Sequence, residues 1–117
     1  MFSLAVRDAY SGACAVTGEH STPALEAAHI KPYGQGGEHL VDNGLPLRSD
    51  LHRLYDRGYM TVDVQSTCVV GYRLREEFEN GRSWYSLHGT AIQAPSPEGC
   101  RPDKRLLVWH KHTLFKE

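Results

Sequence analysis

Apolar positions recur at helical spacing near both ends of the chain, and shorter strand-like runs lie between them. Residues 2–10 (FSLAVRDAY) predict a helix, and KRLLVWHKHTLFKE predicts another with Asp103 as its N-cap. Residues 25–30 (LEAAHI) and the apolar run 45–47 (LPL) predict two strands. The intervening KPYGQGGEH is too rich in glycine for a helix or a central strand, so we expect a loop there.

A further helix is expected directly after the second strand. Ser49 or Asp50 is placed to cap its start, and Gly58 is placed to end it. The turn pair Asn43-Gly44 precedes the second strand, which is therefore expected to return along the first. The predicted order is strand, glycine-rich loop, strand, helix.

The rest of the chain predicts short strands and turns. YMTVDV and CVVGYRL show alternating apolar and polar residues or continuous apolar runs, and they predict a hairpin. REEFENG predicts a short acidic helical turn that stops at Gly81. SWYSL and TAIQA are expected to pair as strands across His88-Gly89, and APSPEGCRP, with its three prolines, is expected to be an irregular loop. The fold class that follows is α+β.

The composition is that of one globular domain. The chain has 117 residues, of which 40% are hydrophobic and 23% charged, and this length is too short for two independent cores. No apolar run approaches the roughly 20 residues that span a bilayer, and the N-terminus does not resemble a secretory leader. Three widely spaced cysteines argue against a disulfide framework and against a four-cysteine zinc site. We therefore expect a soluble, cytoplasmic protein that does not bind membranes.

The charge balance limits the strength of any nucleic-acid binding. The formal net charge is −1, and the pI is about 6.6. Affinity for DNA rests on neutralising phosphates with Lys and Arg, so we expect weak DNA affinity from these residues alone. A separate DNA-recognition domain of a longer protein could then supply the binding affinity.

Four residues in the strand–loop–strand–helix segment carry the side chains that phosphodiester hydrolysis needs. His52 and Asp56 are one helical turn apart, which suits two ligands of one divalent metal and also suits an exposed ion pair. His29 can take a proton from water near neutral pH, or it can be a hydrogen-bonded core histidine. Asn43 can fix the tautomer of a histidine through its amide oxygen, or it can serve only the turn. Taken together, the four favour metal-dependent hydrolysis.

The run from CAVTG through LEAAHIKPYGQGGEHLVDNGLPLRSDLHRLYDRG resembles the ββα-metal core of HNH endonucleases. His29, Asn43 and His52 match the three letters of that name. The pattern is more similar to a bacterial branch with A/S-H-I-x-P, N-G-L-x-L and D/H-x-L-x-D-x-G. That branch often follows domains that recognise modified bases in restriction systems.

The resemblance covers most of the chain. Its core runs from Cys14 to about Asp63, and the tail over 64–117 also resembles extensions in this branch. We therefore expect a single nuclease domain over residues 1–117. Its expected architecture is a ββα-metal core with an N-terminal helix and a C-terminal strand/helix extension.

The resemblance implies a role for each matching residue. His29 matches the general base that activates water, and Asn43 matches the residue that orients this histidine and braces the loop. His52 matches the metal ligand on the helix, and Asp56 matches a position that binds metal in some relatives. The implied cofactor is a divalent metal ion, Mg²⁺ or Mn²⁺, with Zn²⁺, Ni²⁺ and Co²⁺ as alternatives. The implied products have 5′-phosphate and 3′-hydroxyl ends.

One position departs from the commoner pattern of the family. Many HNH enzymes carry Asp or His immediately before the base as another metal ligand, and this chain has Ala28 there. Glu26, on the same strand face as Ala28, is one candidate substitute, and His39 in the glycine-rich loop is the other. There is also no C-x-x-C zinc staple, so packing alone must hold the core.

Other residues near the expected site and in the tail have two interpretations. Lys31 follows the base and is expected to face the scissile strand. Arg48, Arg53 and Arg57 flank the metal helix and either contact phosphates or form solvated surface. The histidines of the tail are expected to be structural or exposed: His88, His110 and His112. The aromatic residues of the tail either cover the core or form a dimer interface: Trp84, Tyr85, Trp109 and Phe115.

The expected function is cleavage of double-stranded DNA, with or without modified bases, by a one-metal HNH mechanism. The chain would then be the cleavage domain of a modification-dependent restriction enzyme. The alternative is a catalytically inactive HNH-like module that binds DNA or a partner, and both Ala28 and the net charge keep it open. One such site reaches one phosphate, so cutting both strands calls for a homodimer, formed on DNA or through other domains.

Overall fold

The strand–loop–strand–helix unit predicted from the sequence is present in the computed structural model, which describes residues 1–79 and 82–116. Nine helices and strands are assigned in this part of the chain, and four short 3-10 turns separate them. In chain order they are α1 (Phe2–Ala9), β1 (Leu25–His29), β2 (Gly44–Arg48), α2 (Ser49–Asp56), β3 (Met60–Val62), β4 (Cys68–Val70), α3 (Arg73–Phe78), α4 (Arg82–Tyr85) and α5 (Lys104–Thr113); the turns are η1 (Thr22–Ala24), η2 (Tyr33–Gln35), η3 (Val41–Asn43) and η4 (Glu98–Cys100).

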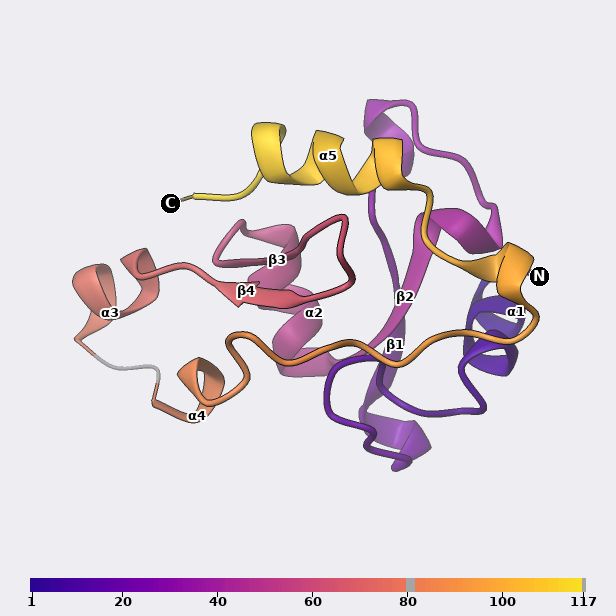
Figure 1. Cartoon of the computed structure of the whole chain (residues 1–117), viewed down its shortest axis with the longest axis horizontal. Coiled ribbons are helices and arrows are strands. Elements are labelled where there is room, and N and C mark those ends of the chain that lie inside the picture. Colours follow the sequence, from indigo (N-terminus) through magenta and orange to yellow (C-terminus); the bar gives the residue numbers. More distant parts are fainter. Residues whose placement is uncertain (80–81, 117) are drawn as a thin grey trace.

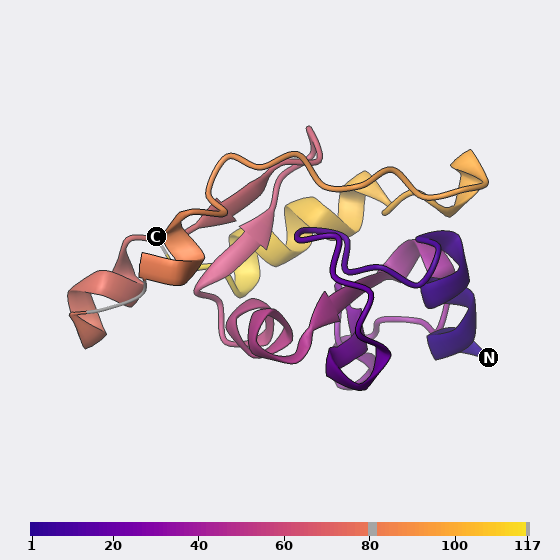
Figure 2. The same ribbon diagram turned by 90° about the horizontal axis from the view of Figure 1, so that it is seen from below.

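The first hairpin positions the residues around the predicted base. β1 and β2 pair antiparallel, with His29 directly opposite Gly44. Gly44 has no room for a side chain, because an added Cβ would lie 2.4 Å from Val6 Cγ2 and 2.9 Å from the ring of Phe2. α1 therefore packs directly on the end of the hairpin that carries His29. β2 leads straight into α2 (Figure 2), so the predicted metal helix is fixed to the same hairpin.

One hydrophobic core joins the first hairpin to the rest of the chain. α2 lies between the two hairpins, β1–β2 and β3–β4 (Figure 1), and contributes Leu51 and Tyr55, both fully buried. α5 covers the second hairpin and contributes Leu107 to the same cluster. No helix among the described residues is long and apolar enough to cross a bilayer.

The predicted N-cap residue of α2 is wrong. Arg48 is the N-cap residue and makes no side-chain capping bond. The Asp50 carboxylate is occupied instead by the Arg48 guanidinium, at 2.9 and 3.0 Å, and by Trp84 Nε1 at 2.9 Å. Ser49 Oγ donates to the carbonyl of Ala24. Both expected caps therefore have other partners, whereas the predicted left-handed Gly58 is confirmed, with φ of 83°.

The second predicted strand pair of the tail is also wrong. Residues 82–85 form α4, and Ala91 makes only an isolated bridge to Thr67. Tyr85 Oη donates to the carbonyl of Gly71, which ties α4 to the end of β4. Trp84 and Tyr85 pack partly buried against the core, so the alternating apolar pattern is satisfied by a helical turn.

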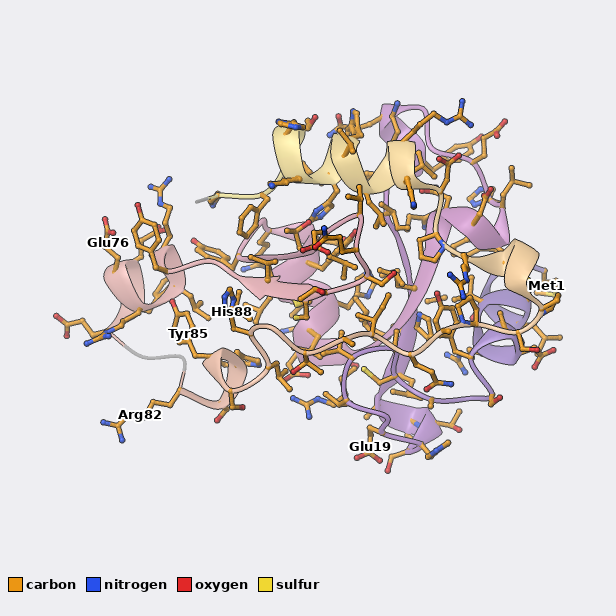
Figure 3. All side chains as sticks on the ribbon, in the orientation of Figure 1. Met1, Glu19, Glu76, Arg82, Tyr85 and His88 are labelled. Carbon is orange, nitrogen blue, oxygen red and sulfur yellow. The ribbon has the colours of Figure 1, made fainter. Side chains whose placement is uncertain are left out.

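Several element ends differ from prediction, and one prediction falls outside the described residues. β4 ends at Val70, and the rest of the predicted second strand begins α3. α5 has its predicted Asp103 cap, which accepts a bond from Arg105 N, but ends at Thr113. The predicted stop at Gly81 falls outside the described residues. Met1 lies at one end of the molecule and Glu76 and Arg82 at the other (Figure 3), so α3 and α4 extend away from the first hairpin.

Candidate active site

His52 is held between two carboxylates. It projects from α2, and its Nδ1 lies 2.7 Å from Glu26 Oε1 on β1. Its Nε2 lies 3.1 Å from Asp56 Oδ2, one helical turn further along α2. These contacts raise the pKa of His52, chiefly through the hydrogen bond with Asp56, against the opposing effect of burial. The helical spacing therefore brings His52 and Asp56 together as predicted, and the strand adds Glu26 on the far side of the ring.

The donor set at His52 suits a divalent metal that keeps part of its water shell. An imidazole nitrogen and a carboxylate oxygen face each other across the Nε2 side, and both are exposed enough to admit an ion. Among the described residues, no group of three or more His, Cys, Asp or Glu side chains is arranged to hold a metal as it stands. Two protein ligands with retained water is an arrangement that Mg²⁺ accepts. Glu26 on Nδ1 has the geometry of a carboxylate that orients a ligating histidine.

His29 lies at the end of β1 and is fixed on two sides. The ring of Phe2 stacks on it, with centroids 4.1 Å apart and planes 7° apart. Its Nε2 lies 2.9 Å from His39 Nδ1. The pKa of His29 is lowered, mainly by partial burial and then by the charge of His39, while the Asp56 carboxylate opposes this shift. A lowered pKa keeps the ring neutral near physiological pH, the state that a general base requires.

Asn43 braces the glycine-rich loop rather than the His29 ring. Its side chain is buried, with Oδ1 accepting from Lys31 N at 2.9 Å. Its Nδ2 donates to the carbonyls of Lys31, at 3.0 Å, and Glu38, at 2.9 Å. The amide therefore closes the loop by joining its two ends. The expected side-chain bond from Asn43 to His29 is replaced by this pattern, and His39 occupies the ring nitrogen instead.

The four predicted phosphate-binding residues lie in different surroundings. Lys31 Nζ lies over the Trp109 ring, 5.2 Å from its centroid. Arg48 is paired with Asp50 and holds the pKa of that carboxyl at about 2. Arg53, on α2, and Arg57, the C-cap residue of that helix, are exposed. Both line a hollow of about 570 Å³ together with Asp50, Tyr59, Phe78 and Trp84.

The tail histidines have structural or exposed positions, as expected. His110 is fully buried, stacks on Tyr55 and is hydrogen-bonded through both ring nitrogens. His88 Nδ1 accepts from Val70 N at 3.0 Å, and His112 is exposed. Tyr85 and His88 (labelled in Figure 3) both line a hollow beside β4.

Sequence patterns did not indicate three of the ring contacts around His29. Phe2 belongs to a helix whose periodicity says only that one face is apolar. Tyr33 stacks on His39, with centroids 4.6 Å apart and planes 8° apart, from within a glycine-rich loop that has no repeating pattern. His39 was a candidate metal ligand, but its contacts are with the rings of His29, Tyr33 and Phe2. Tyr33, the aromatic residue in the loop, was the one sequence feature that could have indicated these ring contacts.

Comparisons with known proteins bear on the core and on the whole fold. A family model described as HNH endonuclease matches residues 14–63. The chain is similar to a solved structure titled "Modification dependent TagI restriction endonuclease", with a TM-score of 0.72 and 20% sequence identity. That match covers 97% of this chain and 37% of the other, so the chain spans well under half of that protein. No curated protein sequence matches the chain. At this identity the likeness concerns the fold, and it includes the tail beyond the matched core.

Proposed function

We propose that this chain hydrolyses phosphodiester bonds of DNA in a metal-dependent reaction with His29 as general base, because a family model described as HNH endonuclease matches residues 14–63. The observation that carries the proposal is a partly buried histidine that has a lowered pKa and lies close enough to His52 and Asp56 for their charges to act on that pKa. A base and a metal-binding pair within electrostatic reach are the minimum that hydrolysis of a phosphodiester requires.

His29 takes a proton from the attacking water in this proposal. The Phe2 ring restricts rotation of the imidazole, and His39 Nδ1 lies 2.9 Å from the Nε2 of His29. The lowered pKa supports this role because a histidine that is already protonated cannot act as a base. General bases of this kind contribute roughly 10²- to 10⁴-fold to rate.

His52 Nε2 and Asp56 would hold the metal, and Glu26 would orient His52 through Nδ1. HNH endonucleases generally use a divalent metal ion, and Mg²⁺ or Mn²⁺ suits a site with few protein ligands. When bound, such an ion neutralises charge on the phosphate and on the 3′ leaving oxygen. His52 must lose its Nε2 proton to bind the ion, so metal affinity should fall at low pH. His39 is not needed as the ligand that replaces the residue missing at Ala28.

The substrate we propose is double-stranded DNA, within a modification-dependent restriction system. The similar fold of a modification-dependent restriction endonuclease supports this choice. Residues 1–117 would form a single cleavage domain, and recognition of modified bases would belong to other parts of a longer, cytoplasmic protein. Arg53 and Arg57, exposed on and directly after the helix that carries the metal ligands, would contact phosphates. A homodimer formed on DNA would supply the second cut.

The competing function is a DNA- or partner-binding module without catalysis. Ala28 favours it, since the commoner third ligand is missing. Nicking of supercoiled plasmid separates the two hypotheses directly. We expect nicked circles with Mg²⁺ or Mn²⁺ and none with excess chelator, and the new ends should carry 5′-phosphate and 3′-hydroxyl. His112→Ala, an exposed histidine of α5, is the matched control and should nick like the unaltered chain. DNA binding without metal-stimulated nicking would support the binding module instead.

A further inference from the structure

Among the described residues, the one side-chain hydrogen bond of His29 is with His39. The distance from His39 Nδ1 to His29 Nε2 is 2.9 Å, and the two ring planes are inclined at 65°. Two neutral imidazole nitrogens at this distance share a single proton, so one ring donates and the other accepts. The direction of this bond therefore fixes which nitrogen of His29 is left unprotonated.

The position of His39 is set by the loop that Asn43 closes. Asn43 Nδ2 donates to the carbonyl of Glu38, the residue directly before His39. Gly37 lies against the other end of the loop, where an added Cβ would come within 1.7 Å of the Lys31 carbonyl. The ring of Tyr33 then stacks on His39. Contacts on the backbone and on the ring face thus hold the His39 imidazole at the Nε2 edge of His29.

We infer that His39 is a positioning residue for His29: it accepts the Nε2 proton of His29 and so keeps Nδ1 as the basic nitrogen. This inference rests on the proposed function of His29, but the bond itself does not. The face of the His29 ring is covered by Phe2, and its Nε2 edge by His39, so only the Nδ1 edge remains for an attacking water. Asn43 then orients the base through the loop and His39, without touching the base.

The tautomer of His29 tests the inference without any measurement of cleavage. Long-range proton–nitrogen NMR correlations distinguish a protonated ring nitrogen from an unprotonated one. In the metal-free chain, at a pH above the histidine range, we expect His29 to carry its proton on Nε2. In His39→Phe, which can still stack on Tyr33 but lacks the accepting nitrogen, we expect a mixture of tautomers. A proton on Nδ1 in the unaltered chain would overturn the inference, as would an unchanged tautomer in His39→Phe.

The kinetic test uses two substitutions of the same residue. Asn presents an amide oxygen near the place of Nδ1, so His39→Asn should restore most of the nicking rate. His39→Phe should lower kcat by roughly 10- to 100-fold, as loss of a partner that orients a functional histidine does, with little change in KM. Equal activity of the two variants would contradict a role as acceptor. A loss of metal affinity in His39→Phe, measured by titration with Mn²⁺, would identify His39 as a ligand and overturn the inference.

If no chain nicks DNA at all, the proposed function fails while the tautomer result stands. The two failures are therefore distinguishable. His39 is exposed, so both variants should fold, and equal thermal midpoints would confirm this.

Discussion

Protonation of His110 should destabilise the chain as pH falls. His110 is fully buried on α5, and its Nε2 donates to the carbonyl of Tyr55 at 2.9 Å. When the ring is neutral, its Nδ1 accepts from the Thr61 hydroxyl, at 2.8 Å. Burial lowers the pKa of His110 to about 4, against an ordinary value of 6.5.

The sign and size of the effect follow from this shift. Between pH 6.5 and about 4 the unfolded chain binds a proton at this residue and the folded chain does not. The free energy of unfolding is therefore lost as pH falls through 6.5, and the loss is complete near pH 4. Linkage gives a loss of about 2 kcal/mol at about pH 5 and roughly 3 kcal/mol at the acid limit.

Urea unfolding with chelator present, followed by tryptophan fluorescence, measures the effect. The matched variant is His110→Gln, which does not titrate but keeps a donor and an acceptor. Other titrating groups, His29 and His52 among them, are common to both chains and cancel in the comparison. Between about pH 8 and pH 5 the unaltered chain should lose about 2 kcal/mol more than His110→Gln. Equal losses in the two chains would refute the assignment of His110 as a buried neutral residue.

Three further predictions concern the site. His52→Ala should abolish calorimetric binding of Mn²⁺ and Asp56→Ala should weaken it, and unchanged affinity in both would mean that α2 does not carry the ligands. Asn43→Ala leaves three backbone groups of the loop without their partner, so urea unfolding should show that the free energy of unfolding falls by roughly 2–4 kcal/mol. A fall of less than about 1 kcal/mol would contradict the bracing role. Nicking should show little sequence preference and be poor at physiological salt, because few basic side chains face the duplex in a chain of net charge −1. Tight, sequence-specific binding would contradict this.

Local sequence signals predicted the elements that carry the site. The short runs LEAAHI and LPL and the turn pair Asn43-Gly44 predicted β1 and β2, and Gly58 marked the end of α2. The four-residue spacing of His52 and Asp56 is enough to put both on one face of a helix, and the structure brings them together. These features depend on residues that are close together in the chain, and for that reason they could be predicted from the sequence.

Features that depend on distant partners were not predictable in the same way. Asp50 looks like a helix cap, but its carboxylate accepts from Trp84 Nε1, which lies 34 residues further along the chain, and also pairs with the nearby Arg48. The alternation at SWYSL fits a strand as well as a helical turn, and the bond from Tyr85 Oη to Gly71 favours the turn. The contact of His39 with His29 depends on how a glycine-rich loop folds back, and hydrophobic periodicity carries no information about that path.

The central claim, that His29 is the general base of a metal-dependent nuclease, is tested most directly by the single-turnover nicking rate of His29→Ala. The rate should fall by at least roughly 10²-fold, because a base acts in the chemical step. Metal affinity should stay near that of the unaltered chain, since His52 and Asp56 remain. Nicking by His29→Ala at the rate of the unaltered chain, with the same metal bound, would contradict the account.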